Sequence, residues 1–245
     1  MTLYGLIGHP LAHSFSATYF AEKFKEQNIT HCEYRNFDIP SIELFSDLVE
    51  AHRELSGLNV TIPYKETIIP FLDELDPEAK LIGAVNCIKI LENGRKIGYN
   101  TDAYGFYHSI KPFLENKSER ALILGTGGSS KAVGYVLQKL GIQVFFASTN
   151  PSKSNHVSYG DITADAIKHF PLIINTTPLG TFPNVETAPE LPYEALTDKH
   201  FLFDLTYNPE ENSVLEKKAK RPVRNLNGKL MLQLQAEKIW SIWNS

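Results

Sequence analysis

The sequence is poor in cysteine, has no long apolar run and carries no strong excess of charge. Cys32 and Cys87 lie far apart, with no Cys-x-x-Cys spacing and no histidine cluster, so neither a disulfide framework nor a metal site is expected and a reducing cytoplasm fits best. The net charge of -4 is scattered along the chain, which argues against nucleic acid as a partner. The first residues resemble neither a signal peptide nor a membrane span, so no membrane partner is expected.

Apolar residues make up 42% of the 245 positions, enough for a real core and for two compact units. In the first half, apolar runs of strand length alternate with segments of helical periodicity. Strands are expected over residues 2–8, 31–38 and 57–63, helices over 16–28, 41–52 and 66–75, and a hairpin over 87–99 that turns at Asn93-Gly94. This order predicts a first α/β unit.

The same alternation restarts after a polar connector at residues 115–120. A helix is expected before the connector, over 104–114, and a strand that runs straight into glycines follows it at residue 121. Further strands are expected over 143–147, 172–177 and 201–205, and a last helix with a strong apolar face over 229–243. The predicted fold class is therefore α/β, with two α/β domains.

Glycines open the second unit in the stretch "ALILGTGGSSKA". Gly125 and Gly127 follow a strand and precede a helix, which lets backbone amides and the positive helix end approach a pyrophosphate. The third glycine of the G-x-G-x-x-G pattern is replaced by Ser130. The strand-glycine-helix-strand context predicts a dinucleotide site, and the alternative is a glycine turn that binds nothing.

The end of the next strand bears on which dinucleotide is bound. NAD-binding domains usually have Asp or Glu there for the ribose 2'-hydroxyl. This chain has Ser148, Thr149 and Asn150, followed by Lys153. Because no carboxylate would repel a 2'-phosphate, the sequence favours NADP.

Polar side chains also stand where the strands of the first unit are expected to end. Open α/β sheets bind ligands at that edge, and hydroxyls, an amide, a cation and an anion suit a small polyhydroxylated acid. Each residue alone has a plainer interpretation as a helix cap, a turn residue or a solvated lysine. Their joint placement favours a substrate site, formed by Ser14, Ser16, Thr61, Lys65, Asn86 and Asp102.

Eight motifs in order give a more specific interpretation: "GHPLAHSFS", "GLNVTIPYKE", "GAVNCI", "GYNTDAYGF", "GTGGSSKA", "NTTPLG", "DLTYNP" and "NGKLMLQLQA". Together they span essentially the whole chain, which resembles shikimate dehydrogenase. The resemblance implies an oxidoreductase acting on a CH-OH group, which reversibly reduces 3-dehydroshikimate to shikimate with NADPH on the route to aromatic amino acids. It also implies a substrate domain over 1–102 with the last helix, 228–245, and a Rossmann-type NADP-binding domain over 103–227, flanking a cleft.

The resemblance implies a role for individual residues of this chain. The catalytic pair falls on Lys65 and Asp102. The substrate contacts fall on Ser14, Ser16, Thr61, Asn86, Tyr207 and Gln235. The cofactor contacts fall on Gly125, Thr126, Gly127, Gly128 and Ser129, on Ser148, Thr149 and Lys153, and on Leu205 and Gly228.

Elementary chemistry gives Lys65 a reason to follow a buried strand. Hydride delivered to a ketone leaves negative charge on oxygen, so a cation that can also supply a proton must lie within hydrogen-bond reach. Pro63 ends the strand and fixes the turn before Lys65. Asp102 would orient the ammonium, and the alternative is an ion pair that is only architectural.

Departures from the family pattern keep two alternatives open. Where the family commonly has Asn and Arg to grip the 2'-phosphate, this chain has Ser148 and Thr149, with Lys153 as the remaining cation. A quinate/shikimate dehydrogenase relative that uses NAD is the nearer alternative. A nonenzymatic nucleotide-binding sensor is the farther one, disfavoured because Lys65 and Asp102 are both present. The oligomeric state stays open, with a homodimer as one option.

Overall fold

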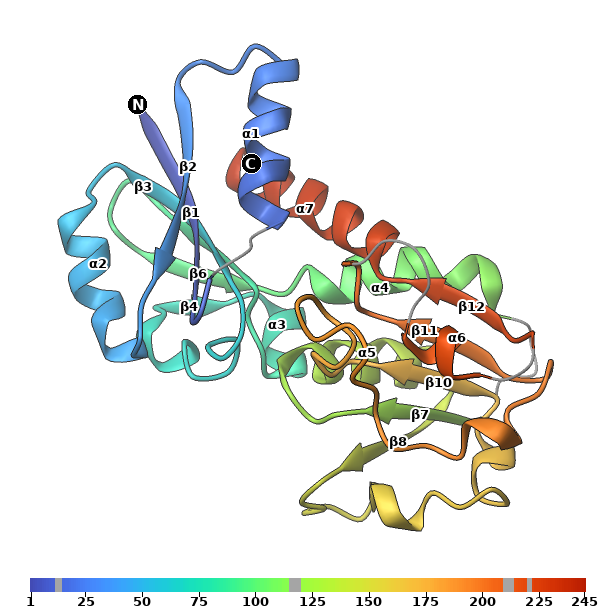
Figure 1. Cartoon of the computed structure of the whole chain (residues 1–245). Helices are drawn as coiled ribbons and strands as arrows, with labels where there is room; N and C mark the ends of the chain where they lie inside the picture. Colours follow the sequence, from blue (N-terminus) through green and yellow to red (C-terminus); the bar gives the residue numbers. More distant parts are fainter. Residues whose placement is uncertain (12–14, 115–119, 209–213, 220–221) are drawn as a thin grey trace. The chain divides into compact units, whose positions relative to one another are not determined.

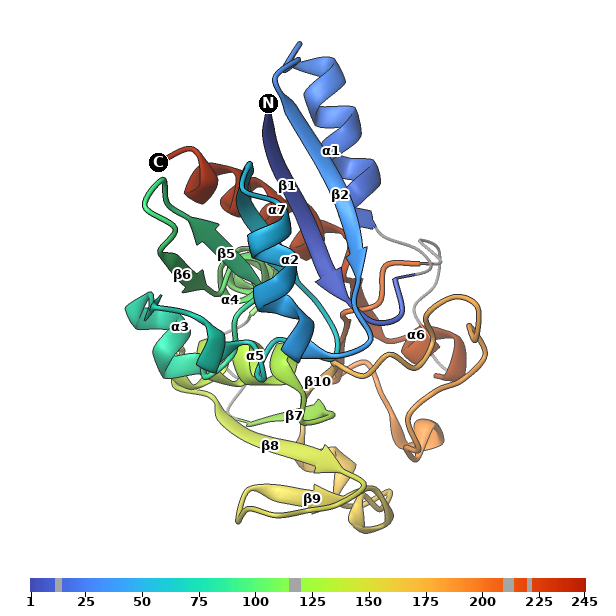
Figure 2. The same ribbon diagram turned by 90° about the vertical axis from the view of Figure 1, so that its left-hand side faces the viewer.

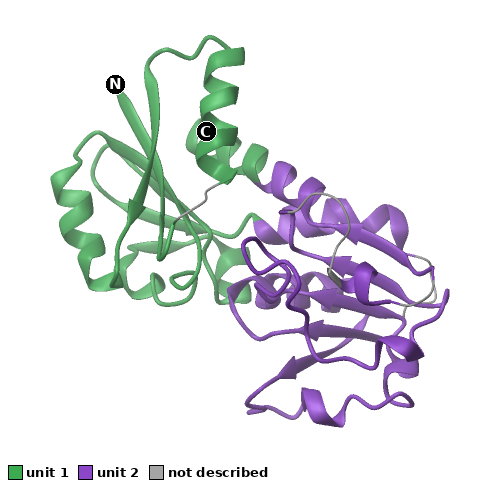
Figure 3. Ribbon diagram, in the orientation of Figure 1, with its two compact units in different colours: residues 1–101, 236–245 green, residues 102–235 purple. Residues whose placement is uncertain are grey.

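The computed structural model describes residues 1–11, 15–114, 120–208, 214–219 and 222–245. The chain divides into two compact units, coloured separately in Figure 3. Unit 1 contains residues 1–101 and 236–245, and unit 2 contains residues 102–235. Each unit has its own six-stranded sheet with helices, so the predicted α/β class is confirmed.

The sheet of unit 1 is mixed and has the strand order β2-β1-β3-β5-β6-β4 (Figures 1 and 2). β1 pairs in parallel with β2 and β3, whereas β5 is antiparallel to β3 and β6. The strands are β1 (Thr2–Gly8), β2 (Cys32–Asp38), β3 (Leu55–Val60), β4 (Glu74–Leu75), β5 (Cys87–Ile90) and β6 (Lys96–Tyr99). The helices are α1 (Phe15–Glu26), α2 (Phe45–Ala51) and α3 (Pro77–Ile82).

Unit 1 packs a different core against each face of its sheet. One core is largely aliphatic and includes Leu58 and Val60 of β3. The other is aromatic and includes Tyr4 and Phe20 together with Trp243 from the end of helix α7 (Lys229–Trp243). Tyr4 stacks on Trp243 with ring centroids 4.5 Å apart. The end of α7 is therefore part of the core of unit 1.

The expected helix over residues 66–75 is wrong. The segment forms turns, a short 3-10 helix, η2 (Ile69–Phe71), and the two-residue strand β4. Pro70 cannot donate a helical hydrogen bond, and Ile68 and Ile69 are β-branched, so an α-helix has little local support here. The helix forms just afterwards as α3, where Asp76 caps it by accepting from the N–H of Glu78 at 3.0 Å.

The sheet of unit 2 is entirely parallel, with the order β12-β11-β10-β7-β8-β9. Its strands are β7 (Arg120–Leu124), β8 (Gln143–Ser148), β9 (His156–Ser158), β10 (Leu172–Asn175), β11 (Phe201–Asp204) and β12 (Arg224–Asn227), and its helices include α4 (Asp102–Ile110), α5 (Gly128–Lys139) and α6 (Val214–Lys218). β9 and β12 were not expected from the sequence. The order reverses between β7 and β10, which is where open parallel sheets bind ligands.

Candidate active site

The glycine loop after β7 forms a cradle at the reversal point of the sheet. Gly125 has a φ of 102°, a conformation that favours glycine, and its N–H donates to the carbonyl of Ala147 at 2.9 Å. A Cβ at Gly125 would lie 3.1 Å from Thr177 Cγ2 and 3.2 Å from Thr176 Oγ1. A Cβ at Gly127 would meet no described residue within 4 Å, so the backbone there is open. This cradle fits the pyrophosphate of a dinucleotide.

Ser130, which replaces the third glycine, does not disturb the cradle. Its side chain is buried, and its hydroxyl donates to the carbonyl of Gly127 at 2.6 Å. The close approach of α5 to the sheet is made by Gly134 instead, where a Cβ would lie 2.8 Å from Phe146 Cζ. The packing role of the missing glycine therefore falls on Gly134.

The end of β8 presents hydroxyls and one ammonium. Ser148 is buried, and its Oγ accepts from the N–H of Asn150 at 3.1 Å, which fixes the turn after the strand. Thr149 and Lys153 are exposed. Because residues 148–153 contain no carboxylate, this edge can accept a 2'-phosphate.

A buried hydrogen-bond network joins the ends of β10 and β11. Asn175 Nδ2 donates to Asp204 Oδ1 at 3.0 Å and to the carbonyl of Leu179 at 3.2 Å. Asn175 Oδ1 accepts from the N–H and the hydroxyl of Thr177 at 3.0 and 2.6 Å. Asp204 Oδ1 also accepts from the N–H of Thr206 at 3.1 Å. The network fixes two loops that border the glycine cradle.

Asp204 is costly to bury in this position. Its side chain is fully buried, and Oδ2 has no hydrogen-bond partner among the described residues. Burial raises the pKa of the carboxyl, and hydrogen bonds from Thr206, from Asn175 and from the backbone of Leu215 oppose that shift. The carboxylate therefore organises its neighbours at the expense of stability.

Leu205 and Gly228 lie at the same edge of the sheet. The N–H of Leu205 donates to the carbonyl of Asn175 at 2.9 Å, and that of Gly228 donates to the carbonyl of Thr206 at 3.0 Å. A Cβ at Gly228 would lie only 2.2 Å from the carbonyl oxygen of Leu205. Only glycine permits this approach, which brings the start of α7 against the loop after β11.

In unit 1, backbone hydrogen bonds hold Thr61, Lys65 and Asn86 together. The N–H of Val60, which precedes Thr61, donates to the carbonyl of Asn86 at 2.9 Å, and the N–H of Val85 donates to the carbonyl of Lys65 at 2.7 Å. The three residues thus stand on two adjoining loops. They supply a hydroxyl, an ammonium and an amide to one edge of the sheet.

Hydrogen bonds of Asn86 and of Tyr64 fix the Asn86 side chain and the turn that carries Lys65. The amide of Asn86 donates to Thr101 Oγ1 at 3.0 Å and accepts from its N–H at 2.7 Å. Tyr64, beside Lys65, is buried and donates its hydroxyl to the carbonyl of Ile39 at 2.6 Å. The turn that carries Lys65 is therefore held against the core of unit 1.

Of the two serines predicted to bind the substrate, the structure describes Ser16. Ser14 lies outside the described residues. Ser16 lies in the first turn of α1, which begins at Phe15. Its hydroxyl interacts with the hydroxyl of Tyr34, a residue that was not predicted.

Asp102, Tyr207 and Gln235 belong to unit 2. Asp102 is buried at the start of α4 and Gln235 is buried on α7. The two helices touch at Gly105, where a Cβ would lie 2.5 Å from the carbonyl oxygen of Met231 and 3.1 Å from Gln235 Cβ. Asp102 and Gly105 are one helical turn apart and share that side of α4. Tyr207 follows β11, and burial raises its pKa.

Comparison with known proteins identifies the family. Residues 6–88 match the family model described as the shikimate dehydrogenase substrate binding domain. The shikimate dehydrogenase (NADP(+)) of Methanococcus maripaludis strain C6 is 39% identical over 261 residues, which cover 98% of this chain and 91% of that protein. The chain belongs to the shikimate dehydrogenase family.

Two solved structures extend the likeness to the whole chain. The shikimate 5-dehydrogenase of Thermus thermophilus, in complex with NADP(H) and shikimate, is 30% identical with a TM-score of 0.83, covering 99% of this chain and 93% of that one. The quinate dehydrogenase of Corynebacterium glutamicum, in complex with NAD, is 27% identical with the same TM-score and coverage. The fold of this shikimate dehydrogenase homologue is thus shared by NADP- and NAD-bound structures.

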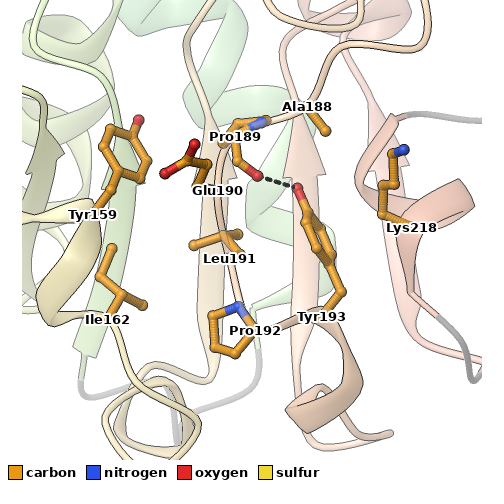
Figure 4. Close-up of a pocket in the computed structure, with 9 residues that line it drawn as sticks. All are labelled: Tyr159, Ile162, Ala188, Pro189, Glu190, Leu191, Pro192, Tyr193 and Lys218. Atoms are coloured by element: carbon orange, nitrogen blue, oxygen red, sulfur yellow. Dashed lines mark hydrogen bonds between the residues drawn. The ribbon is translucent and has the colours of Figure 1, made fainter.

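A surface pocket of about 480 Å³ in unit 2 contains none of the predicted site residues (Figure 4). It is lined by Tyr159, Ile162, Lys218 and the segment 188–193, in which Tyr193 donates to the carbonyl of Pro189 at 2.8 Å.

Within the described ranges, no three His, Cys, Asp or Glu side chains are grouped so as to hold a metal ion. Nor does any described helix have the length and apolarity needed to cross a membrane.

Sequence reasoning missed Tyr34, Asn59, Asn175 and Asp204 in this family member. Each is a polar residue in or at the end of a strand, and each takes part in a side-chain hydrogen bond within its unit. The signal for Asn175 and Asp204 was available, since both directly end apolar runs, "LIIN" and "FLFD". Tyr34 and Asn59 lie in strands whose register the sequence does not give.

Proposed function

We propose that this chain catalyses the reversible, NADPH-dependent reduction of 3-dehydroshikimate to shikimate. The observation that carries the proposal is the Thr61, Lys65 and Asn86 group, held on adjoining loops in a chain 39% identical to a shikimate dehydrogenase (NADP(+)). We propose that the reaction takes place in the cytoplasm, with neither nucleic acid nor a membrane as a partner. A homodimer is compatible with this function.

The cofactor edge of unit 2 suits NADP. Bound NADPH supplies a hydride to the carbonyl carbon of the substrate. The cradle at Gly125 and the start of α5 would hold the pyrophosphate, and Lys153 with the hydroxyls of Ser148 and Thr149 would hold the 2'-phosphate. The residues proposed to contact the cofactor are Gly125, Thr126, Gly127, Gly128, Ser129, Ser148, Thr149, Lys153, Leu205 and Gly228.

Lys65 is proposed to handle the charge that the reaction creates. The substrate oxygen becomes negative as its carbon is reduced, and an ammonium group beside it both stabilises that charge and donates a proton. The carboxylate of Asp102 is proposed to orient the ammonium. Ser14, Ser16, Thr61, Asn86, Tyr207 and Gln235 are proposed to bind the hydroxyls and the carboxylate of the substrate.

A second candidate is a quinate/shikimate dehydrogenase that uses NAD. It is favoured by Thr149, which cannot form the bidentate contact of an arginine with a phosphate, and by the likeness to an NAD-bound quinate dehydrogenase. Under the proposed function, NADP(H) is still preferred, but less sharply than an arginine would allow.

Steady-state kinetics with NADPH and NADH, with 3-dehydroshikimate as substrate, test the proposal. Charge-assisted hydrogen bonds contribute about 1.5 to 3 kcal/mol, so Thr149→Arg should raise the NADPH preference by about ten- to a hundred-fold. Lys153→Ala should lower kcat/KM for NADPH and leave that for NADH nearly unchanged. A wild-type preference for NADH, or for quinate over shikimate, would promote the second candidate.

A further inference from the structure

The carboxylate of Asp38 binds residues 9–11, the segment that follows β1. Asp38 ends β2, and its Oδ1 lies 2.6 Å from His9 Nδ1. Its Oδ2 accepts from the backbone N–H of Leu11 at 3.0 Å. The hydrogen bonds from His9 and from Leu11 lower the pKa of the Asp38 carboxyl below its ordinary value of 3.8, so the group is ionised near neutral pH. One side chain at the end of β2 therefore holds two residues of the segment.

Backbone hydrogen bonds join the start of this segment to the ends of two neighbouring strands. The N–H of His9 donates to the carbonyl of Ile62, just after β3, at 3.1 Å. The N–H of Ile39, just after β2, donates to the carbonyl of Gly8 at 3.2 Å. Asp38 extends this connection from residue 9 to Leu11.

Leu11 and Thr61 lie side by side over Gly8. A Cβ at Gly8 would lie 2.8 Å from Leu11 Cδ2 and 2.5 Å from Thr61 Cγ2, so both methyl groups fill the space that the absent side chain leaves. Threonine carries its methyl and its hydroxyl on the same Cβ. A methyl group held in one place therefore fixes χ1, and with it the direction of the hydroxyl.

We infer that Asp38 is a positioning residue for the substrate: its carboxylate holds Leu11 against the methyl group of Thr61 and so directs the hydroxyl of Thr61 toward the substrate. The inference rests on the proposed function, because Thr61 is a substrate residue only under it. Asp38 itself does not touch the substrate. Without its carboxylate, Leu11 is held less firmly, and the hydroxyl of Thr61 loses its single direction.

Steady-state kinetics of Asp38→Ala and Asp38→Asn in the full-length enzyme test the inference. Asp38→Ala should raise KM for shikimate about five- to ten-fold, the scale of one lost hydrogen bond. Its kcat should stay within about two-fold, the pattern of a contact made equally in ground and transition states. KM for NADP should stay unchanged. Asp38→Asn should recover most of the rise, because the amide oxygen can still accept from the N–H of Leu11.

Asp73→Ala is the matched control in the same unit. Asp73 also accepts from a backbone N–H and from a cationic side chain, both of Lys96, at 2.7 and 3.0 Å. Its side chain is 44% exposed, close to the 47% of Asp38. It lies beside β4 and β6, at the edge of the sheet opposite to β2. Asp73→Ala should leave KM for shikimate unchanged, and urea unfolding of both alanine variants shows whether they differ in stability.

A double-mutant cycle with Leu11→Ala tests whether Asp38 acts through Leu11. If it does, Asp38→Ala combined with Leu11→Ala raises KM for shikimate no further than Leu11→Ala alone. An unchanged KM in Asp38→Ala, an equal rise in Asp73→Ala, or multiplied effects in the double variant would overturn the inference. None of these touches the proposed function, which fails separately if the wild type does not oxidise shikimate.

Discussion

Replacing Gly228 by alanine adds one methyl group where the cofactor edge has no space. The new Cβ would lie 2.2 Å from the carbonyl oxygen of Leu205 and 2.7 Å from its carbon, whereas real Cβ atoms essentially never approach within 3.0 Å. Both obstacles are backbone atoms, so rotation of a side chain cannot relieve the contact. The loop after β11 or the start of α7 must shift by most of an ångström.

The expected effect on activity is larger than the effect on stability. Overpacking typically costs about 1 to 3 kcal/mol of unfolding free energy. A displacement of about 1 Å at a site that positions reactants can cost about a hundred-fold in rate. Gly228→Ala should therefore lower kcat/KM for NADPH by about ten- to a hundred-fold while the protein remains folded.

Steady-state kinetics and urea unfolding of Gly228→Ala give the two quantities. Gly160→Ala is the matched control in the same unit, because among the described residues a Cβ there meets only Ser158 Oγ, at 3.8 Å. The control should stay within about two-fold in kcat/KM and about 0.5 kcal/mol in stability. If Gly228→Ala were as harmless as Gly160→Ala, the close approach at Leu205 would have no role in the cofactor edge.

Two further predictions concern charged groups inside each unit. In unit 1, the side chain of Lys23 is 8% exposed, and its ammonium binds both carboxylate oxygens of Glu237 at 2.8 Å. Glu237→Gln should therefore lower the unfolding free energy by about 1 to 3 kcal/mol. The loss is smaller than for a fully buried ion pair because the side chain of Glu237 is 53% exposed. Urea unfolding measures this, and Lys23→Met in the same chain should recover most of the loss. In unit 2, the pKa of Asp204 in the folded protein is raised above its ordinary value of 3.8. Its contribution to the unfolding free energy is therefore fully present below pH 3.8 and is lost as pH rises through the pKa of the folded protein. The stability of Asp204→Asn relative to wild type should thus increase from about pH 4 toward neutrality, and a constant difference would contradict the raised pKa.

Several strand ends in this chain could be predicted because their signals are local, although β3 ends at Val60 and not at Pro63 as expected. The apolar runs that precede Gly125 and Ser148 form β7 and β8 with nearly the expected bounds. The positive φ of Gly125 follows from the need for a tight turn between a strand and a helix. The edge that carries the candidate residues was therefore accessible from the sequence.

Contacts between strands could not be predicted in the same way. Asn175 and Asp204 meet because β10 and β11 are paired in register, residue 175 opposite residue 204. Tyr34 reaches Asn59 only because β1 separates their strands by the right distance. Such register depends on the packing of the whole unit, and no local pattern reports it.

Single-turnover or steady-state kcat with NADPH tests whether Lys65 acts in the chemical step of 3-dehydroshikimate reduction. Lys65→Ala should lower kcat by about a hundred-fold or more, with a much smaller change in shikimate binding. Lys65→Arg should remain slow, because arginine keeps the charge but does not release its proton. Lys80→Ala, at an exposed position of α3, should match the wild type. A Lys65→Ala enzyme with near wild-type kcat would show that Lys65 has no role in the chemical step.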